Sequence, residues 1–230
     1  MRRAEDSREA RGLSAGLDEV GMGPLAGPLC VAVVVFPEGA TPIPGVTDSK
    51  QLTFNKRMEL APVIMRSATY FGIGWAHPSV IDKRGLSAAW DRACSDALEG
   101  APEIDHLMID GNHELQSYEG KQSTFVKGDA TYWQIGAASI VAKVVRDLDM
   151  LGMSAHYPEY KWDNNMGYGS KAHLDALFKL GPTPYHRGYY LKKLYTKNQE
   201  RIDPANRKWE LWRQRWLVES EHPGEDDVPY

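Results

Sequence analysis

Acidic side chains stand at the ends of predicted strands in this sequence. Asp18 and Glu19 follow an apolar segment, Asp110 ends the run HLMID, and Asp129 ends the segment STFVKGD just before a predicted helix. Strand ends are where sheets flanked by helices build their sites. Carboxylates gathered there repel one another unless cations neutralise them, and hard oxygen ligands favour Mg²⁺ or Mn²⁺ over zinc. Two such ions about 4 Å apart can clamp both oxygens of a phosphodiester displacement.

Each acid also has a simpler explanation. Asp110 precedes Gly-Asn and could form a turn, and Asp129 could cap the helix that follows it. Asp18 and Glu19 are neighbours, and neighbouring strand residues point to opposite faces. Both can bind a metal if the strand ends or twists there, or if one acts through its backbone or a water. The glycine-rich segment that follows, GMGP, makes a strand end plausible.

The remaining pattern predicts the elements that would position these acids. The predicted strands are Gly16–Glu19, Leu29–Phe36, Thr69–Ala76, His106–Asp110 and Ser123–Asp129. The first predicted helix is Phe54–Ala68, capped by Thr53 and kinked or split by Pro62. A helical pattern from Pro78 to about Gly100 is broken at Gly85. Three more helices are predicted: Thr131–Met150, one from the cap Ser170 to Leu180, and a last one that starts at Asp203-Pro204. Strands come first, then strands mixed with helices, then helices alone, and this order indicates an α/β fold with a helical C-terminal part.

Composition limits the class of protein. The chain has 230 residues, one domain in length, with 42% hydrophobic and 25% charged residues. No apolar run approaches the 18 or so residues that span a bilayer, and the N-terminus does not resemble a secretory signal. With Cys30 and Cys94 as its two cysteines, the chain is expected to be a cytoplasmic protein with reduced thiols.

Charge is unevenly distributed along the chain. The net charge is −4, but residues 219–230 hold five acids and no Lys or Arg, so the rest carries −4 + 5 = +1. Residues 179–218 hold ten Lys or Arg against three Asp or Glu, a local +7 that fits either a phosphate-binding surface or a solvated helix face. The stripe of Trp209, Trp212 and Trp216 is expected to be core rather than a base-stacking surface.

Seven blocks together carry a family resemblance. They are GLDEVGMGPLAGP, TDSKQL, LMIDGN, VKGDA, IGAASIVAKVVRD, MGYGSKAHLDAL and GPTPYHR, in that order across roughly residues 13–190. In them the chain resembles ribonuclease HII, the type 2 ribonuclease H. The resemblance implies a ribonuclease H-like α/β fold with a mixed central sheet flanked by helices and a helical C-terminal part.

The family's activity is the next implication. Its members use two divalent ions, Mg²⁺ or Mn²⁺, to hydrolyse the RNA strand of RNA–DNA hybrids. They also cut 5′ of a ribonucleotide embedded in duplex DNA, leaving a 3′-hydroxyl and a 5′-phosphate, a step of ribonucleotide excision repair. The matching metal-binding carboxylates are Asp18, Glu19, Asp110 and Asp129. Asp147 also matches a family position, but it lies four residues after Lys143, where a helical ion pair is expected, so Asp129 is preferred.

Substrate-binding residues follow from the same resemblance. The family contacts the ribonucleotide through a Gly-Arg/Lys-Gly turn and a stacking Tyr, which match Gly21-Met22-Gly23 and Tyr168, and near the nucleic-acid backbone through positions matching Lys50 and Lys143. Met22 and Met166 stand where the family usually has cations. The main-chain contacts should survive, while phosphate attraction should weaken by about 1 kcal/mol per exposed cation.

Two other functions remain open. One is a metal-dependent DNA nuclease of the same superfamily, such as a resolvase, and the other is an inactive hybrid-binding protein. The expected organisation is a flexible arm (1–12), a catalytic domain (13–218, helical from about 170) and an acidic disordered tail (219–230). A monomer is expected, without membrane contact, and the segment Gln214–Val218 faintly resembles a sliding-clamp-binding peptide.

Overall fold

The structure, a computed structural model, describes residues 12–218. These residues form two compact units, the first made of residues 12–22 and 28–149 and the second of residues 23–27 and 150–218. The predicted tail and the predicted arm, apart from Gly12, lie outside the described residues.

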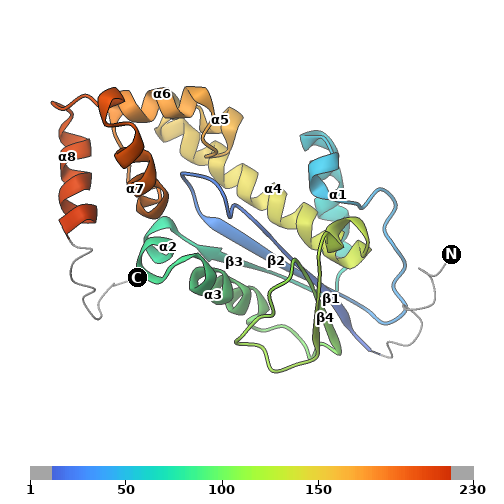
Figure 1. The fold of residues 1–230 in the computed structure, drawn as a ribbon. Coiled ribbons are helices and arrows are strands. Elements are labelled where there is room, and N and C mark those ends of the chain that lie inside the picture. Colours follow the sequence, from blue (N-terminus) through green and yellow to red (C-terminus); the bar gives the residue numbers. More distant parts are fainter. Residues whose placement is uncertain (1–11, 219–230) are drawn as a thin grey trace. The chain divides into compact units, whose positions relative to one another are not determined.

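A mixed five-stranded sheet is the centre of the first unit (Figure 1). Its strands are β1 (Ser14–Val20), β2 (Leu29–Phe36), β3 (Tyr70–Ala76), β4 (His106–Asp110) and β5 (Gln122–Phe125), in the order β3-β2-β1-β4-β5. The pairs β3–β2 and β2–β1 are antiparallel, whereas β1–β4 and β4–β5 are parallel. The carboxyl ends of β1, β4 and β5 therefore meet at one edge of the sheet.

Helices cover both faces of this sheet, which is why every residue of β2 is buried. Odd-numbered residues of β2 pack into a core with α2 (Pro78–Arg84) and α3 (Leu86–Leu98). On the other face, Ala32, Val34 and Phe36 pack against α1 (Phe54–Ser67) and α4 (Trp133–His156). The predicted α/β fold with a mixed, helix-flanked sheet is thus confirmed (Figure 1).

Some helix boundaries differ from the sequence prediction. Thr53 caps α1 as expected, but Pro62 does not split the helix. Pro62 is exposed, so water can reach the carbonyl that loses its partner there. The long helix begins at Trp133 rather than Thr131 and continues past Met150 to His156.

The described part of the second unit is mainly helical. Its helices are α5 (Trp162–Asn165), α6 (Lys171–Leu180), α7 (Gly188–Lys197) and α8 (Arg207–Arg213), followed by a π-helical turn at Gln214–Val218. Trp209 and Trp212 are buried and Trp216 packs against the same core, which confirms the tryptophan stripe as packing. The last helix begins at Arg207, not at Asp203, because Asn206 supplies the cap and Asp203 instead accepts from Ala205 in a turn. Across residues 12–218 no helix is long and apolar enough to span a membrane.

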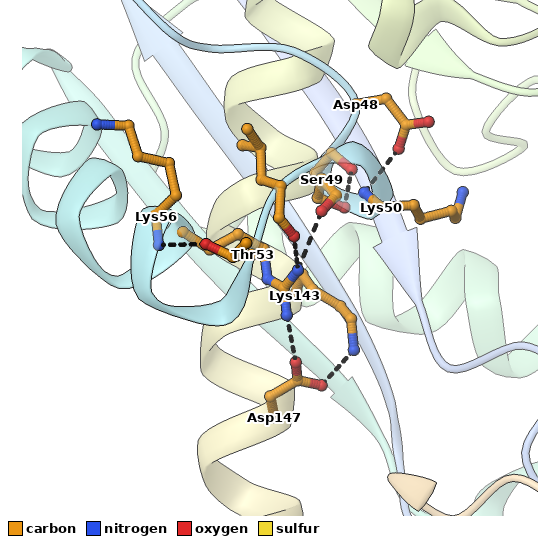
Figure 2. Close-up of polar contacts among 10 residues, drawn as sticks. Asp48, Ser49, Lys50, Thr53, Lys56, Lys143 and Asp147 are labelled. Carbon is orange, nitrogen blue, oxygen red and sulfur yellow. Dashed lines mark hydrogen bonds and ion pairs between the residues drawn. The ribbon is translucent and has the colours of Figure 1, made fainter. Parts of the chain in front are cut away.

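A buried ion cluster joins α1 to α4 in the first unit. Asp147 is 1% exposed and accepts from Lys143 and, at 3.2 Å, from Arg57. Arg57 also donates to the carbonyl oxygens of Ser49 (3.1 Å) and Leu52 (2.6 Å). Figure 2 shows Asp147 and Lys143 on one side of this cluster and the turn of Ser49 on the other. The cluster therefore fixes the turn that precedes α1.

Removing the Asp147 carboxylate should leave Arg57 and Lys143 as buried cations without a counter-charge. We expect Asp147→Ala to lower the free energy of unfolding by about 3 kcal/mol, because breaking a buried pair is costly. Urea denaturation of the metal-free protein measures this change. A loss below about 1 kcal/mol would show that the cluster contributes little to stability.

Candidate metal centre

Three carboxylates converge at the edge where the parallel strands end. Asp18 lies near the end of β1, Asp110 is the last residue of β4, and Asp129 lies in a short turn after β5. One carboxylate oxygen from each lies within 4.8 Å of the other two. The structure thus brings together three of the four acids that the sequence singled out.

Asp129 reaches this place through a turn rather than a strand. The predicted strand Ser123–Asp129 is wrong at its end, since β5 stops at Phe125 and residues Gly128–Ala130 form a 3-10 turn. Lys127 adopts a left-handed conformation (φ 59°), which reverses the chain. The Gly128 N–H then donates to the Asp110 carboxylate at 2.7 Å. The turn therefore both brings Asp129 close to Asp18 and Asp110 and fixes the Asp110 carboxylate.

A glycine in β1 allows α4 to approach the sheet beside this turn. A Cβ on Gly16 would lie 2.1 Å from the carbonyl oxygen of Gln134 in the first turn of α4, a distance that no side chain can occupy. Gly16 and Asp18 share one face of β1, because strand side chains alternate. The contact therefore places α4 on the face of the strand from which Asp18 projects.

Glu19 points to the other face and is not part of the cluster of three. Its carboxylate accepts from the indole N–H of Trp90 on α3 at 3.3 Å. Asp18 instead lies on the α4 side, where the Ser139 hydroxyl lowers its pKa, and it accepts from the backbone N–H of Glu19 at 2.7 Å. The strand does not end between the two acids, so their side chains diverge as strand geometry requires.

Burial and mutual repulsion disfavour charge on these acids. Burial, then Glu19 and Asp110, raise the pKa of Asp18 well above its usual value. Burial and then Asp110 and Asp48 raise the pKa of Asp129, while burial also raises that of Glu19. Because the carboxylates repel one another and are shielded from water, a bound cation would stabilise the folded protein.

Lys50 supplies part of the missing positive charge. Its ammonium lies 3.9 Å from the Asp129 carboxylate, and its side chain is 78% exposed. Burial lowers its pKa, but Asp129, Asp18, Asp48 and Asp110 raise it by more, so Lys50 stays protonated. The Asp48 carboxylate caps this turn on the Lys50 N–H, as Figure 2 shows. The Ser49 hydroxyl bonds the Ser139 hydroxyl at 2.8 Å, which ties the turn to α4.

Lys143 and Asp147 lie in the ion cluster described above. The expected ion pair between them is present, and the Lys143 side chain is 18% exposed. Asp147 does not belong to the three clustered aspartates. Burial, together with Arg57 and Arg146, lowers the pKa of Lys143 by more than Asp147 raises it. In this structure Lys143 thus serves first as a partner of Asp147.

The predicted glycine turn spans both units. In the first unit, Gly21 has φ +97° and a Cβ there would lie 2.4 Å from the Arg146 side chain, so a glycine is required. Met22 is half-buried and packs against the core on the α3 side. In the second unit, the Tyr168 ring lies 3.8 Å from the position of a Cβ on Gly23, and Tyr168 is 46% exposed.

Sequence reasoning missed Trp90, Ser139 and Arg57, each of which holds a predicted residue or its turn. Trp90 occupies an apolar position on its helix, and Arg57 lies in a helix with many charged residues, so neither spacing indicates a polar partner. Trp90 also lines a cavity of about 830 Å³ with Asn112, His113 and Thr124. This cavity adjoins the strand end that carries Asp110.

The donor set fits hard divalent cations, since all three clustered ligands are carboxylate oxygens. We expect Mg²⁺ or Mn²⁺ at a hundredfold excess over its Kd to stabilise the protein by about 2.7 kcal/mol, roughly 5–10 °C in Tm. Asp129→Asn should raise the stability of the metal-free protein, because it relieves repulsion, and should remove most of the gain from metal.

Asp147→Asn is the matched control for that experiment. It should lower the stability of the metal-free protein and keep the gain from metal. Calorimetric scans with and without metal measure both effects. The choice of Asp129 is wrong if Asp147→Asn, and not Asp129→Asn, abolishes the metal response.

Comparison with known proteins identifies the family. The Ribonuclease HII family model matches residues 15–196. The chain is 41% identical over 179 residues to ribonuclease HII of Thermosynechococcus vestitus, covering 78% of this chain and 84% of that one. It is 44% identical over 181 residues to ribonuclease HII of Syntrophobacter fumaroxidans, covering 78% and 77%.

Solved structures support the same fold. Ribonuclease H2 from Pyrococcus horikoshii matches with a TM-score of 0.63 at 24% identity, covering 89% of this chain and 99% of that one. RNase HII from Archaeoglobus fulgidus, solved in complex with PCNA, matches with a TM-score of 0.60 at 22% identity, covering 83% and 91%. The resemblance in the sequence blocks is confirmed, and this chain belongs to the ribonuclease HII family, whose members are endoribonucleases.

Proposed function

We propose that this protein hydrolyses the RNA strand of RNA–DNA hybrids and cuts duplex DNA 5′ of an embedded ribonucleotide, leaving a 3′-hydroxyl and a 5′-phosphate. The observation that carries the proposal is the cluster of Asp18, Asp110 and Asp129, two of them buried, at the ends of parallel strands. In a ribonuclease HII chain, such a cluster fits a reaction that requires divalent cations. Removal of ribonucleotides from DNA would be the cellular use.

The three clustered aspartates would hold the cations. Glu19, whose side chain lies on the other face of the strand, would be the fourth ligand through its backbone or a water. When bound, two Mg²⁺ or Mn²⁺ ions lower the pKa of the attacking water and neutralise charge on the phosphate. Asp110 is held in place by the Gly128 N–H and Asp18 by the Glu19 N–H. The exposed ammonium of Lys50 can pair with a substrate phosphate beside the cluster.

Recognition of the ribonucleotide would use Gly21, Gly23 and Tyr168. Backbone groups can approach a 2′-hydroxyl closely at a glycine, and the exposed ring of Tyr168 can stack on a neighbouring sugar. Met22 offers no charge to the phosphates, so affinity should depend less on salt than it would with an Arg in its place. Lys143 would contribute to phosphate binding if the substrate competes for it with Asp147.

The sequence also leads to two predictions about where the protein acts and what it binds. The first is a cytoplasmic location. The second is a sliding-clamp contact through Gln214–Val218, which the PCNA complex of the Archaeoglobus fulgidus protein makes worth testing. In this chain Trp216 packs against the helical core and Gln214 bonds Glu210, so a clamp would have to compete with that packing.

Cleavage of a DNA duplex that contains one internal ribonucleotide tests the proposed function. We expect a cut on the 5′ side of the ribonucleotide in Mg²⁺ or Mn²⁺, reduced at least a thousandfold by Asp110→Asn because a cation ligand is lost. Long RNA–DNA hybrid and all-DNA duplex serve as controls, resolved on denaturing gels. Cutting of the all-DNA duplex would favour a resolvase, and binding without cutting would favour an inactive hybrid-binding protein.

Met22→Arg should strengthen substrate binding. An added cation near the phosphates is expected to gain about 1 kcal/mol and to steepen the slope of log K against log salt by about 0.9. Both quantities follow from titrations of labelled hybrid at several salt concentrations in the Asp110→Asn background, which prevents cleavage. Equal affinity and slope with and without the Arg would mean that residue 22 does not face the phosphates.

A further inference from the structure

Two histidines form a buried pair in the second unit. His173 on α6 is fully buried and His186, just before α7, is 5% exposed. Their Nε2 atoms lie 3.0 Å apart. Neither residue belongs to the metal centre, and the proposed reaction does not use them.

The partners of His173 fix where its proton lies. Its Nδ1 is 2.9 Å from the carbonyl oxygen of Tyr168, which can only accept, so Nδ1 donates. Its Nε2 must then accept, and both the Trp162 indole N–H (3.1 Å) and His186 Nε2 face it. His186 therefore donates through Nε2.

The partners of His186 agree with this assignment. Its Nδ1 accepts from the Thr183 N–H at 3.0 Å and lies 2.9 Å from the Thr183 hydroxyl. Both rings are thus neutral, each with one donor and one acceptor satisfied. Burial lowers the pKa of both imidazoles, which keeps them in this state at neutral pH.

The pair connects two loops that hold the segment after the glycine turn. Gly167, next to Tyr168, accepts from the N–H groups of Leu25 and Ala26 at 2.9 and 3.3 Å. From the other loop, Tyr185 accepts from Gly27 at 2.9 Å, and Arg187 donates to Leu25 at 2.8 Å. Segment 23–27 therefore lies between residues 165–170 and 183–187, and His173 and His186 bond these two loops to each other.

We propose that His173, supported by His186, is a positioning residue for ribonucleotide recognition, because it fixes the backbone at Tyr168 through its Nδ1–H. This inference rests on the proposed function, in which Tyr168 stacks beside the ribonucleotide. His173 touches no substrate and acts through the Tyr168 carbonyl. Its effect should therefore depend on the presence of the Tyr168 ring.

Two isosteric variants separate positioning from general stability. His173→Asn keeps an N–H donor where Nδ1 lies, whereas His173→Gln places its amide where Nε2 lies and loses that donor. On duplex DNA with one ribonucleotide, we expect kcat/KM to fall about tenfold in His173→Gln and to stay within about threefold of the wild type in His173→Asn.

A double-mutant cycle with Tyr168→Ala completes the test. Where the ring is absent, His173→Gln should lower kcat/KM by no more than about twofold, because the two losses are coupled. Trp209→Phe is the matched control, since it removes a buried hydrogen bond to the Leu177 carbonyl in the same unit and leaves the bond between His173 and Tyr168 in place. Its effect should be equal with and without Tyr168→Ala.

Several outcomes would overturn the inference. Additive losses for His173→Gln and Tyr168→Ala would do so, as would equal damage from the Asn and Gln variants. Circular dichroism at the assay temperature verifies folding, and if His173→Gln is unfolded, Thr183→Val, which weakens the hold on His186, replaces it in the cycle. Normal cleavage by the wild type with additive losses contradicts only the inference, whereas a wild type that leaves the ribonucleotide uncut contradicts the proposed function itself.

Discussion

Repulsion among three clustered aspartates, two of them buried, is the constraint on which the first unit depends. Asp18, Asp110 and Asp129 hold oxygens within 4.8 Å of one another, and Asp18 and Asp129 are nearly closed to water. Without a cation this arrangement opposes folding, as the raised pKa values of Asp18 and Asp129 indicate. The surrounding structure must therefore supply enough packing and hydrogen bonding to keep the carboxylates together before metal binds.

Rigid neighbours provide that support. Parallel pairing of β1, β4 and β5 brings the three chain segments to one edge, and Gly16 allows α4 to lie against β1. The buried cluster of Arg57, Asp147 and Lys143 fixes the turn that carries Lys50, the cation nearest Asp129. The ion cluster thus helps to position Lys50 beside the three aspartates, although its own residues lie outside the metal centre.

Sequence patterns predict the structure correctly where a residue's role depends on its neighbours in the chain. The all-apolar run Leu29–Phe36 predicted a doubly covered strand, and the spacing of Lys143 and Asp147 predicted their ion pair. The patterns failed where the role depends on contacts distant in sequence. Nothing near Arg57 indicates that it meets Asp147, and the left-handed turn at Lys127 that ends β5 early has no glycine at that position. The divergence of Asp18 and Glu19 was foreseen as a difficulty, but Trp90 as the partner of Glu19 was not.

Anomalous diffraction from crystals of the wild-type protein grown with Mn²⁺ would show whether the three aspartates hold cations, because it locates the ions without reference to activity. We expect anomalous peaks at the edge of the sheet, within about 2.3 Å of oxygens from Asp18, Asp110 and Asp129. An empty cluster at saturating Mn²⁺, or a cation bound at Asp147 instead, would show that the three aspartates are not the metal centre.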